Sequence, residues 1–105
     1  MVADFEAARR VVEAYADDVR AVLPIDKVVL YGSYATGKAT LLSDIDVCFF
    51  MTDFGGKSRV DIIVKLLDLT DRYKGIYFEP IVFPTSEIDR GNPFVKEILA
   101  TGIEI

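Results

Sequence analysis

The stretch that decides the fold is KVVLYGSYATGKATLLSDIDVCFFM, residues 27–51. Residues 27–31 are rich in β-branched and aromatic side chains and end at Gly32, which predicts a strand buried on both faces. Residues 44–51 predict a second strand, and the apolar second half of this strand favours a central place in the sheet. Small residues dominate the connecting segment 32–42. The stretch therefore predicts two strands joined by a tight glycine-containing turn.

The segments on either side of this stretch alternate between helical and extended patterns. Four more elements are expected: a helix from Phe5 to Val22, stopped by Pro24; a helix from Ser58 to near Gly75; a strand over 76–83; and a short helix from Asn92 and Pro93 to Ala100, stopped by Gly102. This alternation predicts an α/β fold, with a small mixed β-sheet flanked by helices.

Two of these elements carry more specific expectations. The helix after residue 58 is expected to begin with a capping box of Ser58 and Asp61. Its buried face is expected to consist of Val60, Ile63, Val64 and Leu67. The strand over 76–83 contains Glu79 and Pro80, which places it at an edge of the sheet or at a bulge.

Length and composition limit the function classes. The 105 residues predict a single domain over 1–105, and a net charge of −5 disfavours nucleic acid and favours a cation as partner. There is no histidine, and Cys48 is the only cysteine, which excludes Ser/His/Asp triads, histidine-ligated zinc and an internal disulfide. Among metal ions, the composition favours hard cations that prefer oxygen ligands. We find no membrane-spanning run and no signal peptide, so no membrane association and a cytoplasmic location are expected.

The glycine turn fits two phosphate-binding motifs unequally well. Residues 32–38, GSYATGK, nearly spell a P-loop, but Ala39 stands where a hydroxyl must hold Mg²⁺. The next strand also begins too soon for the helix that a P-loop requires. The alternative interpretation combines the Gly32-Ser33 turn with Asp44 and Asp46 at the head of the next strand.

Asp44 and Asp46 are two residues apart, so in a strand their carboxylates point to one face, with Cβ atoms roughly 6 to 7 Å apart. Two carboxylates this close repel each other unless a cation lies between them. Acidic residues at a strand start can also be no more than solvated turn formers. The nearby Gly32-Ser33 turn favours the interpretation as a functional site, because it can offer backbone N–H groups and a hydroxyl to a phosphate beside the cation.

Taken together, GSYATG over 32–37 and SDIDV over 43–47 resemble the signature of the minimal nucleotidyltransferases of the polymerase-beta-like superfamily. The resemblance in element order covers nearly the whole chain, and the residue-level identity lies within 32–47. It implies a nucleotidyltransferase-like fold and transfer of a nucleoside monophosphate from a nucleoside triphosphate, usually ATP, to a hydroxyl, with two Mg²⁺ ions. Gly32 and Ser33 would hold the phosphates, and Asp44 and Asp46 would hold the metals.

The family pattern adds a third acidic residue on a later strand, usually an aspartate. In this chain only Glu79 matches that position, and its alternative interpretation is an edge-strand charge that prevents pairing with another sheet. Lys38 follows the glycine turn and is a candidate for the triphosphate, as are Lys57 and Arg59, although each is also an ordinary surface residue. Tyr34 could stack on the base or pack over the turn.

The sequence is therefore compatible with two functions. In the first, the chain is an active Mg²⁺-dependent adenylyltransferase. Similar free-standing proteins pair with a helical HEPN protein in toxin–antitoxin modules, so the resemblance implies that partner as acceptor, with an antitoxin role for this chain. A domain this small leaves little room for an acceptor pocket, so either the acceptor is a hydroxyl on another protein or a partner subunit in a homo- or hetero-oligomer completes the site. In the second, the chain is a catalytically silent subunit that binds a nucleotide or a partner.

Overall fold

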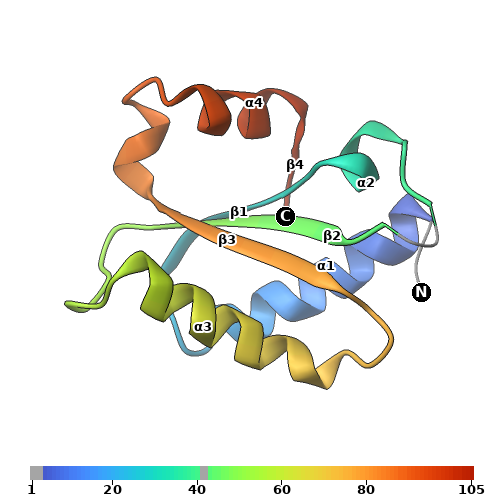
Figure 1. Cartoon of the computed structure of the whole chain (residues 1–105), viewed down its shortest axis with the longest axis horizontal. Helices are drawn as coiled ribbons and strands as arrows, with labels where there is room; N and C mark the ends of the chain where they lie inside the picture. Colours follow the sequence, from blue (N-terminus) through green and yellow to red (C-terminus); the bar gives the residue numbers. More distant parts are fainter. Residues whose placement is uncertain (1–3, 41–42) are drawn as a thin grey trace.

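The computed structural model describes residues 4–40 and 43–105, which form a mixed four-stranded sheet with helices on both faces (Figure 1). The helices are α1 (Phe5–Arg20), α2 (Ser33–Thr36), α3 (Arg59–Leu69) and α4 (Pro93–Thr101), with 3₁₀ turns at Thr70–Arg72 and Thr85–Ile88. The strands are β1 (Ile25–Tyr31), β2 (Ile45–Met51), β3 (Phe78–Pro84) and β4 (Ile103–Glu104). The predicted fold class is thus confirmed.

The strand order is β3-β2-β1-β4, with β1 antiparallel to both β2 and β4 and β3 parallel to β2. The predicted central place of the second strand and the edge position of the strand with Pro80 are both confirmed. Pro80 lies opposite Val47 on β3, an edge strand that pairs on one side with β2, so a residue without an N–H is tolerated there.

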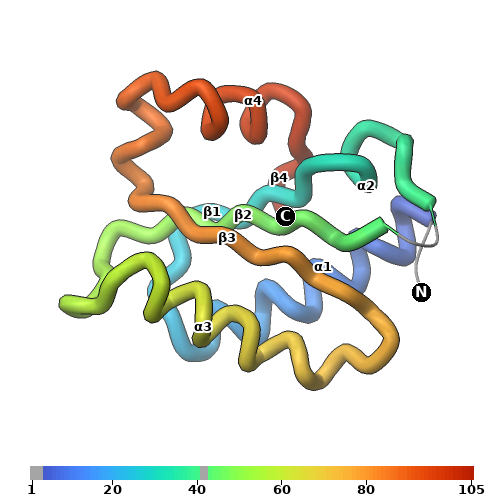
Figure 2. Tube along the Cα trace, in the orientation of Figure 1, coloured from blue at the N-terminus to red at the C-terminus, as the bar shows by residue number. Residues whose placement is uncertain are grey.

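Helices lie on both sides of the sheet, with α1 and α3 on one side and α4 on the other (Figures 1 and 2). The side chains of the sheet divide between these two layers. On one face, Ile45, Val47 and Phe49 pack with the helices α1 and α3. On the other face, Cys48 and Phe50 pack with α4. Cys48 is fully buried, as expected for a small core residue. Asp46 lies two residues before Cys48 in β2, so its side chain belongs to the α4 face as well.

Local capping signals predicted the starts of two helices. The Ser58 hydroxyl accepts from the Asp61 N–H, and the Asp61 carboxylate accepts from the Ser58 N–H, so the capping box is confirmed. At α4, the Asn92 side chain accepts from the N–H groups of Phe94 and Val95, and Pro93 is the first helical residue. These short-range hydrogen bonds depend only on neighbouring residues, which is why the sequence predicts them.

The predicted buried face of α3 is wrong for three of its four residues, since only Ile63 packs against the core. Ile62 and Leu66 are the buried residues of the helix, whereas Val60, Val64 and Leu67 are 68%, 52% and 45% exposed. Apolar residues occur around most of this helix, so the 3.6-residue period fits more than one face and docking on the sheet selects one. The helix also ends at Leu69, before a 3₁₀ turn, instead of near Gly75.

Three short elements were not predicted: α2 in the glycine turn, the 3₁₀ turn after β3, and the two-residue strand β4. Each is too short for a periodic pattern. None of the helices in residues 4–40 and 43–105 has the length and apolar character needed to cross a membrane.

Candidate functional site

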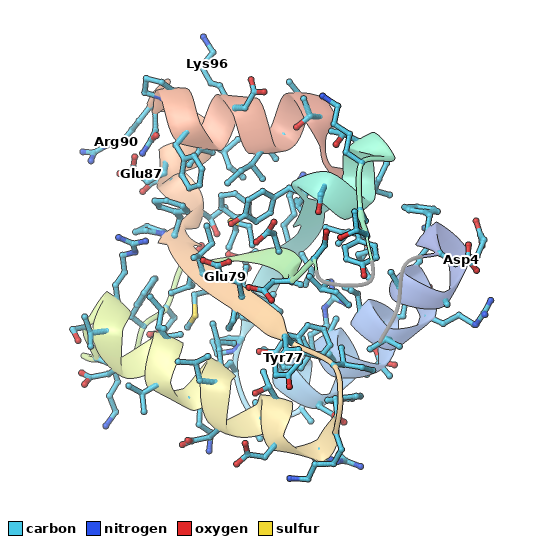
Figure 3. All side chains as sticks on the ribbon, turned by 45° about the vertical axis from the view of Figure 1, so that its right-hand side comes forward. Asp4, Tyr77, Glu79, Glu87, Arg90 and Lys96 are labelled. Atoms are coloured by element: carbon cyan, nitrogen blue, oxygen red, sulfur yellow. The ribbon has the colours of Figure 1, made fainter. Side chains whose placement is uncertain are left out.

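The candidate site lies where three strands meet at one end of the sheet. In the register of the sheet, Tyr31 at the end of β1 lies opposite Asp46, and Asp46 lies opposite Glu79 near the start of β3. Residues in register on neighbouring strands point to the same face, so the three side chains form a row across the sheet. Figure 3 shows Glu79 on the side of the sheet that carries α4.

Gly32 follows Tyr31 directly and brings the backbone against Asp46. Its φ of 73° lies in the left-handed region. A Cβ at this position would overlap the carboxylate of Asp46, at atom Oδ2. Only glycine therefore allows the turn and the acidic side chain to occupy adjacent space, and the turn then continues into α2, whose first residue, Ser33, is partly exposed.

Asp46 and Glu79 form a coupled carboxyl pair. Asp46 is half-buried, and its pKa is raised from 3.8 to about 6, first by burial, then by the negative charge of Glu79, by a side-chain hydrogen bond with Glu79, and by the charge of Asp44. A hydrogen bond between two carboxyl groups requires a proton on one of them. In the metal-free protein, the pair therefore retains a proton at a pH where an isolated aspartate is ionised.

Asp44 contributes to the site as a nearby charge. It precedes β2 and is exposed, so the predicted strand is one residue too long at this end. Among the described residues, no three histidine, cysteine, aspartate or glutamate side chains lie together in a group that could hold a metal ion. The structure thus brings Asp46 and Glu79 into contact, while Asp44 acts on them through its charge.

The residues present are suited to Mg²⁺. All candidate ligands are carboxylate oxygens, which this cation prefers, and Mg²⁺ in proteins commonly uses one or two carboxylates together with substrate phosphates. The pair of Asp46 and Glu79 meets that requirement without a third ligand. A cation there would also offset the burial and the repulsion that together raise the pKa of Asp46.

The other candidate residues, three basic and one aromatic, lie in different parts of the molecule. Lys38 is exposed and lies two residues after the end of α2. Arg59 is engaged further along β3: its Nε donates to the Val82 carbonyl at 2.6 Å, and its guanidinium lies 4.4 Å from the centre of the Phe83 ring. Lys57 follows the far end of β2. Tyr34 is 3% exposed and packs in the core, so of its two predicted roles the structure shows packing.

Tyr31 is a residue of the site that the sequence reasoning missed. Its pKa is raised by burial and then by electrostatic interaction with the ionisable side chains of Asp46, Cys48 and Glu79. Its ring meets Phe94 edge to face at 6.2 Å, and Phe94, half-exposed at the start of α4, meets Phe83 in the same way at 6.0 Å. The available signal was its position: the residue before the glycine turn ends an antiparallel strand and so lies near the head of the next one.

Comparison with known proteins agrees with the fold. A family profile described as "Nucleotidyltransferase domain" matches residues 12–101. Among solved structures, a crystal structure of a Sulfolobus solfataricus protein, provisionally assigned there as a nucleotidyltransferase, matches with a TM-score of 0.65 at 19% identity. That match covers 99% of this chain and 86% of the other. A search of curated proteins finds no significant match.

Proposed function

The chain belongs to the nucleotidyltransferase domain family, and on that basis we propose that it transfers a nucleoside monophosphate from a nucleoside triphosphate, ATP by preference, to a hydroxyl group. In this reaction the acceptor oxygen bonds to the α-phosphorus, the bond between the α- and β-phosphates breaks, and pyrophosphate leaves. The hydroxyl proton passes to a base or to solvent.

The single observation that carries the proposal is the contact between Gly32, Asp46 and Glu79. A backbone turn without a side chain lies directly against a coupled carboxyl pair. Mg²⁺ bound there would supply neutralisation of the charge that develops on the phosphate oxygens. We assign Asp46 and Glu79 as its ligands, and we propose that Asp44, whose charge already acts on Asp46, joins them when two ions and the nucleotide are bound.

The other residues of the turn would bind and orient the triphosphate. Gly32 and Ser33 would place backbone N–H groups and a hydroxyl on the phosphates, and Lys38, exposed after α2, would neutralise a further oxygen. Glu79 replaces the aspartate that is usual at its position. Its side chain reaches Asp46, which supports its role as a ligand despite the additional methylene group.

We further propose that the acceptor lies on another protein, a helical HEPN-type partner in a toxin–antitoxin pair. A domain of this size leaves little surface for an acceptor pocket beside the acidic pair, so a protein surface would complete the site. A cytoplasmic location is consistent with the free, buried thiol of Cys48.

The silent-subunit alternative also has support in the structure. The described residues hold no group of three metal-ligating side chains, and Asp46 retains its proton to a higher pH than an ordinary aspartate. Such a subunit would bind a nucleotide or a partner but would not turn over.

Labelled nucleotides distinguish the two functions. The protein is incubated with Mg²⁺, the product of its neighbouring gene, and ATP labelled at either the α- or the γ-phosphate. We expect incorporation of the α-label alone, since γ-label in the product would indicate phosphoryl transfer. Asp46→Asn and Glu79→Gln should lower incorporation by at least about a hundredfold, the usual scale for removing a group that acts in the transition state. Asp89→Asn, an exposed aspartate, is the matched control.

The result that overturns the enzymatic proposal is an absence of incorporation from any of the four nucleoside triphosphates. Binding of Mg²⁺-ATP in calorimetry without turnover would then support the silent subunit. Incorporation that persists in Asp46→Asn would instead show that the site is misassigned.

A further inference from the structure

An aromatic ring close to the acidic pair is left half-exposed by the fold. Phe94, the second residue of α4, is 50% exposed. Its ring meets Tyr31 at 6.2 Å with an interplanar angle of 85°, and Phe83 at 6.0 Å with an angle of 65°. Both contacts are edge to face, so within residues 4–40 and 43–105 no aromatic ring is stacked flat on Phe94. These three residues form an aromatic cluster.

The other two rings of the aromatic cluster are already engaged. The Arg59 guanidinium lies 4.4 Å from the centre of the Phe83 ring, and Phe50 stacks on that ring at 6.4 Å. Tyr31 is partly buried and packs against the core on the α4 face of the sheet. Phe94 is therefore the ring of the cluster that has surface to offer to a ligand.

The aromatic cluster is continuous with the candidate site. Tyr31 belongs to both, because it pairs with Asp46 between β1 and β2. Paired residues of antiparallel strands lie roughly 5 Å apart at Cα, and the Phe94 ring is one ring contact further away. The cluster lies on the α4 face, to which Glu79 also points (Figure 3). A phosphate held between Gly32 and Asp46 would thus have this ring nearby.

The start of α4 holds Phe94 in a fixed position. Its N–H donates to the Asn92 side chain at 3.0 Å, and Pro93 restricts the backbone at the first helical residue. Asn92 in turn donates from its side-chain amide to Glu87 at 3.4 Å. Because the backbone that carries the ring is already fixed, a ligand that stacks on the ring loses less free energy to ordering the protein.

A nucleobase is the occupant that the position of this ring favours. In the proposed function, the phosphates lie at the glycine turn and the acidic pair, and the ribose alone separates the α-phosphate from the base. The base therefore lies one sugar away from the acidic pair, within reach of Phe94. Each base has a flat π face, and stacking on an aromatic side chain requires no hydrogen bond.

Tyr77 is the other strongly exposed aromatic residue in the part of the chain that the structure describes. It is 65% exposed and directly precedes β3. Unlike Phe94, it makes no ring contact with the described residues, so no neighbouring ring fixes its orientation. The supported ring of Phe94 is thus the better preorganised of the two.

On the basis of the proposed function, we propose that Phe94 binds the base of the nucleoside triphosphate by stacking, with Tyr31 and Phe83 supporting its ring at the edges. The phenyl ring has no hydrogen-bonding group, so it responds to the area of the base instead of its polar edge. A purine has a larger face than a pyrimidine and is bound more tightly, which agrees with ATP as the donor.

Calorimetric titration without an acceptor tests the stacking. Mg²⁺-ATP, Mg²⁺-CTP and Mg²⁺-tripolyphosphate, which lacks the base and the sugar, are titrated into wild type and Phe94→Ala. We expect the variant to bind ATP about five- to a hundredfold more weakly, the usual range for loss of a base–aromatic stack. Binding of tripolyphosphate should stay unchanged, and the preference for ATP over CTP should shrink. Neither measurement requires turnover, so an active enzyme and a silent subunit give the same result.

Two controls remove an exposed apolar side chain elsewhere. Tyr77→Ala removes the other exposed ring, and Leu67→Ala removes a side chain that is 45% exposed on α3, on the opposite face of the sheet. Both should bind ATP as tightly as wild type does. Circular dichroism verifies that all three variants are folded.

A tryptophan at position 94 reports the contact directly. The chain contains no tryptophan, so Phe94→Trp introduces a single indole fluorophore. We expect this variant to keep the affinity of wild type for ATP, because the indole also stacks on a base. Mg²⁺-ATP should quench its fluorescence, whereas Mg²⁺-tripolyphosphate should not.

The inference alone is overturned if wild type binds Mg²⁺-ATP and Phe94→Ala binds it equally well, or if the variant loses ATP and tripolyphosphate to the same extent. It is also overturned if ATP binds Phe94→Trp without quenching, or if Tyr77→Ala is the variant that loses ATP. Unchanged ATP affinity with lower incorporation into the acceptor would assign the ring to the acceptor instead. A wild-type chain that binds neither ATP nor tripolyphosphate would overturn the proposed function together with this inference.

Discussion

Asp46 is the acidic residue of the site whose ionised form is disfavoured by its surroundings. It is half-buried, and the charges that act on it most strongly are the negative ones of Glu79 and Asp44. Burial and repulsion both disfavour its ionised form, and this is why its pKa is about 6 instead of 3.8. A position that is unfavourable in the isolated fold is typical of a group that serves a ligand.

Replacement of Asp46 by asparagine should stabilise the metal-free protein. The amide keeps a donor for Glu79 and carries no charge, so at pH 7 we expect the free energy of unfolding to rise by about 1 kcal/mol, discounted for partial exposure. The folded-state pKa lies above the unfolded one, so the wild-type stability contributed by this group is complete below about pH 4 and is lost as the pH rises through about 6. Chemical unfolding in EDTA, at several pH values, measures both effects.

Asp89→Asn is the control for this measurement, because Asp89 is an exposed aspartate away from the site. An Asp46→Asn protein that is less stable than wild type at pH 7 would show that the carboxylate has a structural role.

At the scale of elements, two features position the site. They are the turn between β1 and α2 and a hydrogen bond between α1 and α3. Gly32 and Gly37 flank α2 as its N-cap and C-cap, both with positive φ. On the other face of the sheet, the buried Tyr15 hydroxyl of α1 donates to the Leu66 carbonyl of α3 at 2.7 Å. The glycine turn fixes the approach of the backbone to Asp46, and the hydrogen bond between Tyr15 and Leu66 fixes the helical layer beneath the strands.

Gly32→Ala and Gly37→Ala should differ in cost. Both force alanine into a left-handed conformation, which costs about 1 kcal/mol. Gly37 has open space at the Cβ position, whereas at Gly32 the Cβ overlaps Asp46, so Gly32→Ala should cost about 3 kcal/mol in total. Thermal unfolding compares the two variants. Adding Asp46→Ala to Gly32→Ala should recover most of the difference, and equal costs for the two single variants would contradict the close approach.

Tyr15→Phe should lower the free energy of unfolding by about 1 to 2 kcal/mol. The variant removes the donor and leaves the carbonyl of Leu66 buried without that partner. Tyr77→Phe is the control, since Tyr77 is 65% exposed. Urea unfolding that gives the same stability for wild type and Tyr15→Phe would mean that water replaces the lost donor.

At the scale of the whole molecule, the site belongs to no single element. Tyr31, Asp46 and Glu79 come from three strands, and the parallel pairing of β2 with β3 requires α3 as the crossover between them. A ligand that bridges the acidic pair and the glycine turn would therefore hold β1, β2 and β3 together and stabilise the entire fold.

Mg²⁺ with nucleotide should raise the melting temperature of the wild-type chain, and EDTA should reverse the rise. At a ligand concentration a hundredfold above Kd, linkage gives roughly 2 to 3 kcal/mol, or about ten degrees or more for a domain of this size. Asp46→Asn should show no shift, because the ligand of the cation is lost. Differential scanning fluorimetry measures both proteins, and an equal shift of both would show that the nucleotide binds elsewhere.

Much of the fold follows from short-range patterns in the sequence. The capping residues Ser58 and Asn92 and the strand-forming run before Gly32 act on their own neighbours, so their effects are visible without any tertiary information. The site residues could be singled out for a similar reason: a lone Glu79 in an apolar strand and an Asp-x-Asp at a strand head are locally unusual. The exposed side of α3 could not be predicted, since its apolar residues fit several faces equally well.

By itself, the sequence determined the class of the fold, its central and edge strands, and the acidic and glycine residues from which a phosphate site can be built. Only the tertiary structure decided that Asp46 contacts Glu79 while Asp44 stays exposed, that Tyr31 joins the row, and that α3 turns an apolar ridge outward. The physical reason is one of range. Capping and alternation depend on residues a few positions apart, whereas these contacts depend on strand register and helix docking between segments far apart in the chain.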